Sequence, residues 1–267
     1  PVGAAPADPA AREAWQVEAQ TRATLNFLGV ARTLNEHAGP DEVSIQPFPL
    51  CPACARDPLA NEDWVLSGEA PTQLCVCRAH GRRHKPYFRV LTENWHGSEI
   101  YNIEKSRQIL GTWWGVGAHL CLAMTRPGSL IGFQSDNQAK ANELIGRAEV
   151  IYRTLPRELQ RFGPMSDSVK ARARKIESEI IFRHVDERGR PATSRVLAIP
   201  SGPNPVRMYT FTALLMDECQ HWESDQDFED SYAAALPTVK GGGKLLTISS
   251  VGHPQSYQHR LCAGLIA

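Results

Sequence analysis

Apolar and amphipathic stretches alternate along the chain after residue 98. Short runs of bulky apolar residues have the length of buried strands, and longer stretches carry apolar residues at helical spacing. The pattern predicts strands at residues 100–103, 130–134, 179–184, 195–199, 211–216 and 245–248, and helices at residues 112–124 and 137–155. Because such alternation is typical of an α/β fold, we expect a mainly parallel sheet flanked by helices.

Capping and turn residues refine these boundaries. Asp136 precedes the second helix and is predicted to be its N-cap, and Pro156 is predicted to end it. The polar segment 186–191 separates the strands at 179–184 and 195–199, which predicts a local antiparallel addition to the sheet.

The first 90 residues depart from this alternation. Residues 1–45 are rich in alanine and carry apolar positions that predict one or two helices between Asp8 and His37. Residues 46–90 gather cysteine and histidine, and residues 91–267 hold the alternating core. We therefore expect an N-terminal helical segment, a small Cys/His-rich insert and an α/β core, in that order.

The composition is typical of a soluble globular chain. It has 267 residues, of which 42% are hydrophobic and 22% are charged, enough for one large domain with an appendage. The longest apolar stretch, around residues 113–124, is too short to span a bilayer, so we expect no membrane partner. Because the chain has 29 basic and 29 acidic residues, contacts with DNA phosphates would have to come from local patches. Two basic runs, 78–85 and 170–175, are candidates, although such runs more often form a solvated face.

The octet at residues 105–112, Lys-Ser-Arg-Gln-Ile-Leu-Gly-Thr, lies between the first predicted strand and the first predicted helix of the core. It is similar to a degenerate phosphate-binding loop, G-x-x-x-x-G-K-[ST], in which backbone N–H groups and a lysine surround the phosphates and a hydroxyl binds Mg²⁺. Thr112 fills the last position, and Gly111 replaces the usual lysine. Lys105 has a side chain long enough to fold back over the loop, so we predict that it supplies the missing charge.

Leu110 stands where the loop normally has glycine. Because leucine does not readily take positive φ, we expect the curvature of the loop to differ from the standard one. A basic loop before a helix is by itself more often a solvated turn than a nucleotide site. Its interpretation therefore depends on residues farther along the chain.

The apolar run at residues 211–216 ends directly in Asp217 and Glu218. An acidic pair at the carboxyl end of a buried parallel strand is the Walker B arrangement, in which one carboxylate holds Mg²⁺ through water and the other deprotonates the attacking water. An acidic pair alone also fits a strand that ends in solvent. Together with the octet, it predicts a nucleotide site with Asp217 on the metal and Glu218 as the base.

The last apolar run follows three glycines and ends in Ser249 and Ser250. Ligands of open α/β sheets lie at the carboxyl ends of the strands, so we expect both serines near Thr112 and Asp217. Hydroxyl groups at that position can sense the terminal phosphate. The alternative is a solvent-exposed strand end with small polar residues.

The order of these motifs resembles one family, the ATPase domain of large terminase subunits, which package DNA into the capsids of phages and related viruses. The resemblance covers residues 85–255, roughly. It rests on the octet followed by Trp113, on the run 132–136 with the helix that ends at 151–156, and on 216–219 with 236–238 and 243–249.

The resemblance implies a P-loop NTPase fold of the ASCE or RecA-like class that hydrolyses ATP with Mg²⁺. Arg107 is implied to stabilise transferred charge and Glu218 to be the catalytic base. Arg207 is similar in placement to an arginine that some terminases insert into a neighbouring subunit's site, although an ordinary surface arginine fits equally well. The implied ATP-binding residues are Lys105, Ser106, Arg107, Gln108, Gly111, Thr112, Asp217, Ser249 and Ser250, with Thr112 and Asp217 on magnesium.

The resemblance also implies partners and a place of action. ATP hydrolysis would translocate double-stranded DNA into a procapsid, with the portal protein and the small terminase subunit as partners. The motor would be a homo-oligomeric ring, a pentamer on the portal, in the host cytoplasm and docked on the procapsid. Large terminases usually add a nuclease domain, and none is expected within residues 91–267.

Two other functions remain open from the sequence. A different P-loop DNA helicase or remodeller with a zinc insert would need a second RecA-like domain. A zinc-bearing adaptor that keeps the ATPase fold but turns over weakly is favoured by Leu110 and Gly111, which depart from the standard loop.

Cysteine and histidine side chains cluster in the insert. A C-x-x-C pair and a C-x-C pair, about twenty residues apart, are followed by His80 and His84, a spacing similar to that of a zinc ribbon or knuckle. Two disulfides or free thiols are the alternatives, and disulfides are rare in cytosolic proteins. The predicted ligands of a structural Zn²⁺ are Cys51, Cys54, Cys75 and Cys77, with His80 as the alternative to one thiolate.

Overall fold

The computed structural model describes residues 6–30, 76–77, 82–83, 87–107, 109–155, 157–160, 178–185 and 189–266. The chain divides into two compact units, residues 1–97 and 98–267. In the described parts of both units, no helix has the length and apolar character needed to cross a bilayer.

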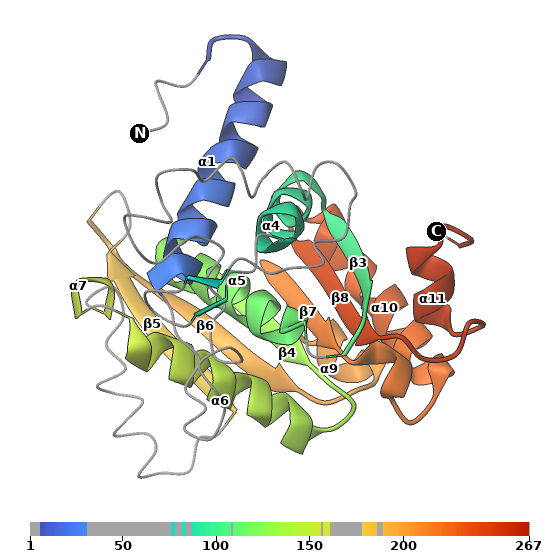
Figure 1. Ribbon diagram of the computed structural model, residues 1–267. Helices are drawn as coiled ribbons and strands as arrows, with labels where there is room; N and C mark the ends of the chain where they lie inside the picture. Colours follow the sequence, from blue (N-terminus) through green and yellow to red (C-terminus); the bar gives the residue numbers. More distant parts are fainter. Residues whose placement is uncertain are drawn as a thin grey trace. The chain divides into compact units, whose positions relative to one another are not determined.

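The described part of the first unit is built around two helices (Figure 1). The long helix α1 packs against α4, and large side chains such as Leu28 and Trp95 are buried. The hydroxyl of Thr24 hydrogen-bonds the Nε2 atom of His96 at 2.9 Å, which satisfies two polar groups inside this pair. The elements of the unit are α1 (Pro9–Val30), β1 (Val76–Cys77), β2 (Arg82–Arg83) and α4 (Tyr87–Gly97), and β1 pairs antiparallel with β2.

A six-stranded sheet forms the core of the second unit, in the order β3-β8-β7-β4-β6-β5 (Figure 1). All neighbouring strands run parallel except β5 and β6. The strands are β3 (Ile100–Lys105), β4 (Leu130–Gln134), β5 (Glu179–Val185), β6 (Pro191–Ile199), β7 (Ala213–Asp217) and β8 (Lys244–Ser250). The predicted α/β fold with a mainly parallel sheet is confirmed.

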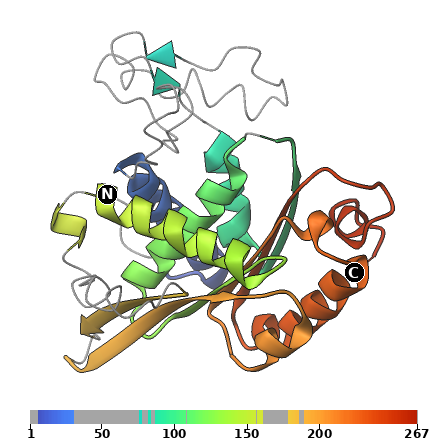
Figure 2. The same ribbon diagram turned by 90° about the horizontal axis from the view of Figure 1, so that it is seen from below.

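Helices cover both faces of this sheet (Figures 1 and 2). Helices α5 and α6 lie on one face, and α9, α10 and α11 lie on the other. The helical segments of the unit are α5 (Gly111–Thr125), α6 (Gln138–Thr154), α7 (Arg157–Gln160), α9 (Pro203–Arg207), the 3₁₀ turn η1 (Cys219–His221), α10 (Asp225–Lys240) and α11 (Tyr257–Cys262).

Strand β7 is apolar from Ala213 to Met216 because it is buried on both faces. Leu214 and Met216 belong to the apolar cluster that packs α10 against the sheet. Leu215 lies on the other face, close to Gly115 of α5. Since side chains alternate along a strand, Asp217 falls on the α5 side, where that helix begins.

The structure corrects a capping prediction and confirms a strand-pairing prediction. The N-cap of α6 is Asn137, whose side chain accepts a hydrogen bond from the backbone N–H of Lys140 at 3.0 Å. Asp136 instead accepts from the backbone N–H of Glu223 at 3.0 Å, which ties the end of β4 to the segment after η1. Strands β5 and β6 pair antiparallel, as predicted, and β6 in turn pairs in parallel with β4.

Candidate active site

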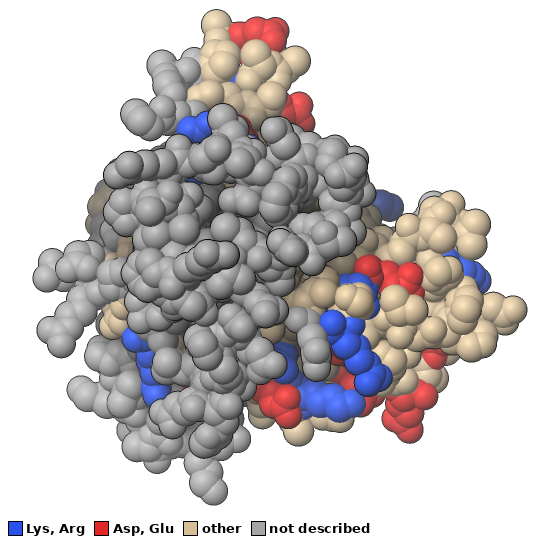
Figure 3. All heavy atoms as spheres, in the orientation of Figure 1, with Lys and Arg blue, Asp and Glu red and all other residues tan. Residues whose placement is uncertain are grey.

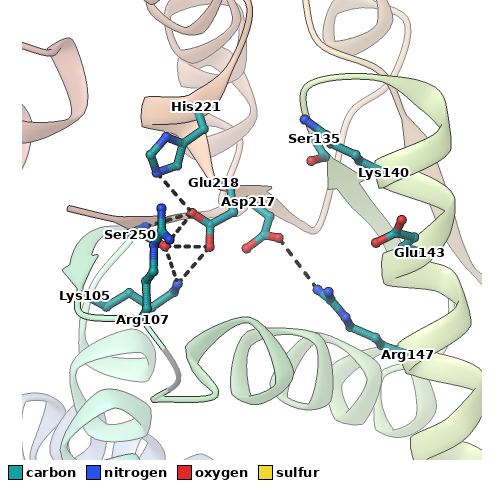
Figure 4. A pocket seen from close by; sticks show the side chains of 10 residues that line it. All are labelled: Lys105, Arg107, Ser135, Lys140, Glu143, Arg147, Asp217, Glu218, His221 and Ser250. Atoms are coloured by element: carbon teal, nitrogen blue, oxygen red, sulfur yellow. Dashed lines mark hydrogen bonds and ion pairs between the residues drawn. The ribbon is translucent and has the colours of Figure 1, made fainter. Parts of the chain in front are cut away.

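Polar side chains converge on one pocket of about 520 Å³ at the carboxyl ends of the parallel strands (Figure 4). Cationic and anionic side chains lie together on this face of the molecule (Figure 3). Such a mixture suits a ligand that is anionic and carries a metal ion. The lining residues are Lys105, Arg107, Ser135, Lys140, Glu143, Arg147, Asp217, Glu218, His221 and Ser250.

Lys105, the last residue of β3, is buried, with 7% of its side chain exposed. Its ammonium group donates to Glu218 Oε1 at 2.9 Å and to Ser250 Oγ at 3.3 Å. The aliphatic part of the side chain passes over Gly111, where an added Cβ would lie 2.8 Å from Lys105 Cδ. Lys105 therefore folds back over the loop, and Gly111 leaves room for it.

The conformation of Leu110 differs from the sequence expectation. Leucine was expected to avoid positive φ, yet Leu110 has φ 55° and ψ 23°, in the left-handed region. This conformation costs a non-glycine residue roughly 1–2 kcal/mol. It lets leucine form the turn into α5 that glycine forms in a standard loop, so the surrounding structure overrides the local preference.

The start of α5 offers backbone donors to a ligand. Leu110 occupies the N-cap position and has no side chain that can accept a hydrogen bond from the helix. The first N–H groups of a helix lack intrahelical acceptors, and the helix dipole favours negative charge at this end. The 15-residue helix α5 thus begins in a form that favours phosphate binding.

Thr112 and Asp217 form an oxygen pair beside this helix end. The Thr112 hydroxyl donates to Asp217 Oδ1 at 2.8 Å. Burial raises the pKa of the Asp217 carboxyl to about 6, against the lowering effect of the hydrogen bond from Thr112. A hydroxyl and a carboxylate side by side are hard oxygen ligands of the kind that Mg²⁺ prefers.

Glu218 is held in place by its neighbours. Its backbone has φ 52°, and it shares this left-handed conformation only with Leu110 among the described non-glycine residues. The Ser250 hydroxyl donates to the carboxylate at 2.8 Å from Oε2, and the Ser250 N–H donates at 2.9 Å. Burial of Glu218 raises its pKa, but the hydrogen bonds from Lys105 and Ser250 outweigh burial and leave the pKa below its ordinary value.

The two serines of β8 face opposite sides of the sheet. Ser250 reaches the pocket, whereas Ser249 accepts a hydrogen bond from the backbone N–H of Gln220 at 3.0 Å. Alternation along the strand explains the difference. The structure therefore brings only one of the two predicted serine hydroxyls, that of Ser250, to the acidic pair.

Gln220 joins several segments on that opposite side. Its side-chain oxygen accepts from the backbone N–H of Gly252 at 2.7 Å, and its amide donates to Glu104. Glu104 also accepts a hydrogen bond from His259 Nδ1 of α11 at 2.8 Å. The ends of β3, β7 and β8 are thus linked to α11 behind the pocket.

The remaining predicted residues are placed as follows. Arg107 is exposed and lines the pocket, and Ser106 is exposed beside it. Arg207 ends α9, is exposed and does not line the pocket. Gln108 and four of the five candidate zinc ligands, Cys51, Cys54, Cys75 and His80, lie outside the described residues, and of Cys77 only the backbone in β1 is described.

Sequence reasoning missed several residues of the pocket. Arg147 of α6 lies with its Nη1 atom 3.9 Å from Asp217 Oδ2, and His221 Nε2 lies 3.9 Å from Glu218 Oε2. Lys140, Glu143 and Arg147 come from one side of α6 (Figure 4). Their spacing of three and four residues was a visible signal, but it is also typical of any solvated helix face.

Comparison with known proteins gives distant structural neighbours. No protein-family model matches the chain, and no match was found among curated proteins. The ATPase domain of the Thermus phage P74-26 large terminase is similar, with 20% identity, a TM-score of 0.44, and 60% of this chain and 64% of that chain covered. The HK97 bacteriophage large terminase is similar with 13% identity, a TM-score of 0.42, and 70% and 37% covered. The chain thus spans less than two thirds of either neighbour's length.

Replacement of Asp217 by asparagine is expected to stabilise the metal-free protein at pH 7.5. Because the pKa of Asp217 rises from its ordinary 3.8 to about 6 on folding, the folded state holds this proton more tightly than the unfolded chain. The ionised carboxylate therefore lowers stability above pH 6, by on the order of 1–3 kcal/mol, and the effect disappears as the pH falls to 4. Denaturant unfolding with a chelator present, at pH 7.5 and pH 4, measures the difference.

Glu218→Gln is the matched control for that measurement. The pKa of Glu218 is lowered in the folded protein, so its ionised form is favoured by folding and its loss is expected to destabilise the protein at pH 7.5. An Asp217→Asn variant less stable than wild type at pH 7.5 would contradict the interpretation.

The left-handed conformation of Leu110 predicts that a glycine variant at this position is more stable than an alanine variant, the reverse of the order inside a helix. Leu110→Gly is expected to be about 1 kcal/mol more stable than Leu110→Ala, because both remove the side chain but only alanine is strained at φ 55°. Equilibrium unfolding of the two variants gives the difference. At Ala233, an exposed position inside α10, glycine is expected to be about 1 kcal/mol less stable than alanine. The same order at both positions would rule out the left-handed turn.

Proposed function

We propose that this chain is the ATP-hydrolysing P-loop domain, of the ASCE class, of a large-terminase packaging motor. One observation carries the proposal: Lys105 and Thr112 of the loop meet Glu218 and Asp217 of the acidic pair. The direct bond between Lys105 and Glu218 spans 113 residues of sequence. Lys105, Asp217 and Glu218 line one pocket, and the hydroxyl of Thr112 donates to Asp217 beside it.

The donor set of the pocket fits Mg²⁺ and a nucleotide phosphate chain. Thr112 and Asp217 supply adjacent oxygens, and the start of α5 supplies backbone N–H groups. Lys105 and Arg107 supply positive charge on the loop side. Thr112 and Asp217 would hold Mg²⁺, which would neutralise charge that develops during transfer.

The bond between Lys105 and Glu218 couples binding to catalysis. In the structure described here, the ammonium group keeps the pKa of Glu218 low, which makes the carboxylate a weak base. Phosphate oxygens would draw Lys105 away and return basicity to Glu218, while Ser250 keeps the carboxylate in position. Glu218 would then accept the proton of the attacking water only when a nucleotide is present.

The wider assignment extends this chemistry to a DNA-packaging machine. Arg207 is exposed on α9 and is proposed to act in the site of a neighbouring subunit, with Arg107 acting within its own. The chain would work as a homo-oligomeric ring on the portal, with double-stranded DNA as the load and the small terminase subunit as a partner. Its place of action would be the host cytoplasm, on the procapsid.

A structural Zn²⁺ in residues 46–90 is a separate proposal. It rests on the spacing of the four cysteines in the sequence, since thiolates in such pairs bind Zn²⁺ tetrahedrally. In the described part of the chain, no cluster of His, Cys, Asp and Glu side chains is placed to hold a metal ion.

DNA-stimulated ATP hydrolysis by the assembled motor tests the main proposal. Glu218→Gln is expected to lower turnover at least about 100-fold while nucleotide binding is retained, because glutamine keeps the shape of the side chain but cannot accept the proton of water. Lys105→Ala is expected to lower both turnover and nucleotide affinity. Turnover at the wild-type level in both variants would overturn the assignment.

Two comparisons make this assay specific. Arg183→Gln, an exposed change on the edge strand β5, is expected to leave turnover within about twofold of wild type, as is usual for surface substitutions. An assembled motor that binds nucleotide without hydrolysing it would favour the adaptor function instead.

Metal analysis of the purified protein tests the zinc site. One Zn²⁺ per chain is expected, and Cys54→Ser is expected to lower this content because a structural site needs all four ligands. Cys262→Ser, at a half-buried position in α11, serves as the control and is expected to keep the metal. A zinc content near zero in the wild-type protein would exclude the site.

A further inference from the structure

Arg147 is a cation of the pocket that neither sequence motif includes. It lies on α6, across the acidic pair from Lys105 and Arg107 (Figure 4). Its guanidinium carbon is 5.8 Å from the ring centroid of Trp113, in the first turn of α5, and its Nη1 atom is 3.9 Å from Asp217 Oδ2. The residue is therefore held by the same helix start that offers donors to phosphate.

The contact with Asp217 leaves donors of Arg147 available. A charge-assisted hydrogen bond is 2.7–2.9 Å long, roughly, and the observed 3.9 Å is well beyond that range. A guanidinium group has five N–H donors in a fixed plane, which match the oxygens of a phosphate. With 31% of its side chain exposed, Arg147 can reorient toward a ligand without breaking a hydrogen bond to Asp217.

The ion pairs of the pocket also favour an anionic ligand as a partner of Arg147. Lys105 is paired with Glu218, and Lys140 is paired with Asp136. Arg147 shares Asp217 with the proposed metal position, where a bound cation would compete with it for the carboxylate. An anionic ligand beside that cation offers the displaced guanidinium a new partner.

We propose that Arg147 binds the terminal phosphate of the nucleotide from the α6 side and so distinguishes a triphosphate from a diphosphate. This rests on the proposed function. Lys105 and Arg107 would serve the loop side of the phosphate chain, and Arg147 would serve the side beyond Asp217. Trp113 is a positioning residue, because its ring lies beside the guanidinium group and does not line the pocket.

Nucleotide binding to the full chain tests the role of Arg147 independently of turnover. Affinities for a non-hydrolysable ATP analogue and for ADP, both with Mg²⁺, are measured by titration calorimetry. Arg147→Gln is expected to lower the affinity for the ATP analogue about tenfold or more, which is the effect of losing one hydrogen bond to a charged group. The affinity of the same variant for ADP is expected to change less than about threefold. Arg153→Gln, an exposed arginine in the last turn of the same helix, is the control and is expected to preserve both affinities.

The outcomes separate this proposal from the broader one. A ratio of analogue to ADP affinity that is unchanged in Arg147→Gln overturns the role of Arg147 and leaves the proposed function intact. Wild-type protein that binds neither nucleotide overturns both. If Arg147→Gln fails to fold, as judged by circular dichroism, Arg147→Lys decides: it keeps the charge but lacks the planar donors, so a reduced ratio supports the proposal and a wild-type ratio overturns it.

Discussion

The ion pair between the buried Lys105 and the partly exposed Glu218 is the interaction on which the rest of the site depends. A lysine with 7% of its side chain exposed is stable only when its charge is paired and its hydrogen bonds are satisfied. Glu218 and Ser250 meet this need, and in doing so they join the ends of β3, β7 and β8. The requirement also reaches α5, because the stem of Lys105 needs the space above Gly111. One charge therefore positions the loop, the helix start and the acidic pair together.

The strained backbone of the site follows from the same constraint. Leu110 and Glu218, the two described non-glycine residues with positive φ, lie at the two segments that the lysine connects. Glu218 is fixed by the hydrogen bond from its N–H to Ile248 O, and Trp222 Nε1 donates to the carbonyl of Asp217 at 3.0 Å. Neighbouring structure thus supports conformations that the isolated segments would avoid.

The spacing of apolar residues predicted the strands and helices whose boundaries depend on local sequence. Strand β4 has the bounds that its apolar run predicted, and α5 and α6 differ from the prediction by one residue at each end. The sequence missed α10, although Ser224 caps it and Phe228, Tyr232, Ala235 and Val239 have helical spacing. Pro237 lies in the last turn of this helix.

The site shows where sequence reasoning reaches its limit. Motif spacing was enough to assign Lys105, Thr112, Asp217 and Glu218 to one place. It could not give the conformation of Leu110, which tertiary contacts impose against local preference. Arg147 was not predicted from the sequence, because its contact with Asp217 joins two segments seventy residues apart. One arginine on a helix face does not indicate such a contact.

The opposed serines at the end of β8 have a mechanical consequence. On one side of the sheet, Ser250 hydrogen-bonds the Glu218 carboxylate. On the other side, Ser249 hydrogen-bonds the backbone of Gln220, which lies two residues later in the same turn. The turn after β7 is thus held by hydrogen bonds on both sides of the sheet. Gln220 is hydrogen-bonded to Glu104, and Glu104 to His259, so α11 is joined to the same strand end that carries Glu218.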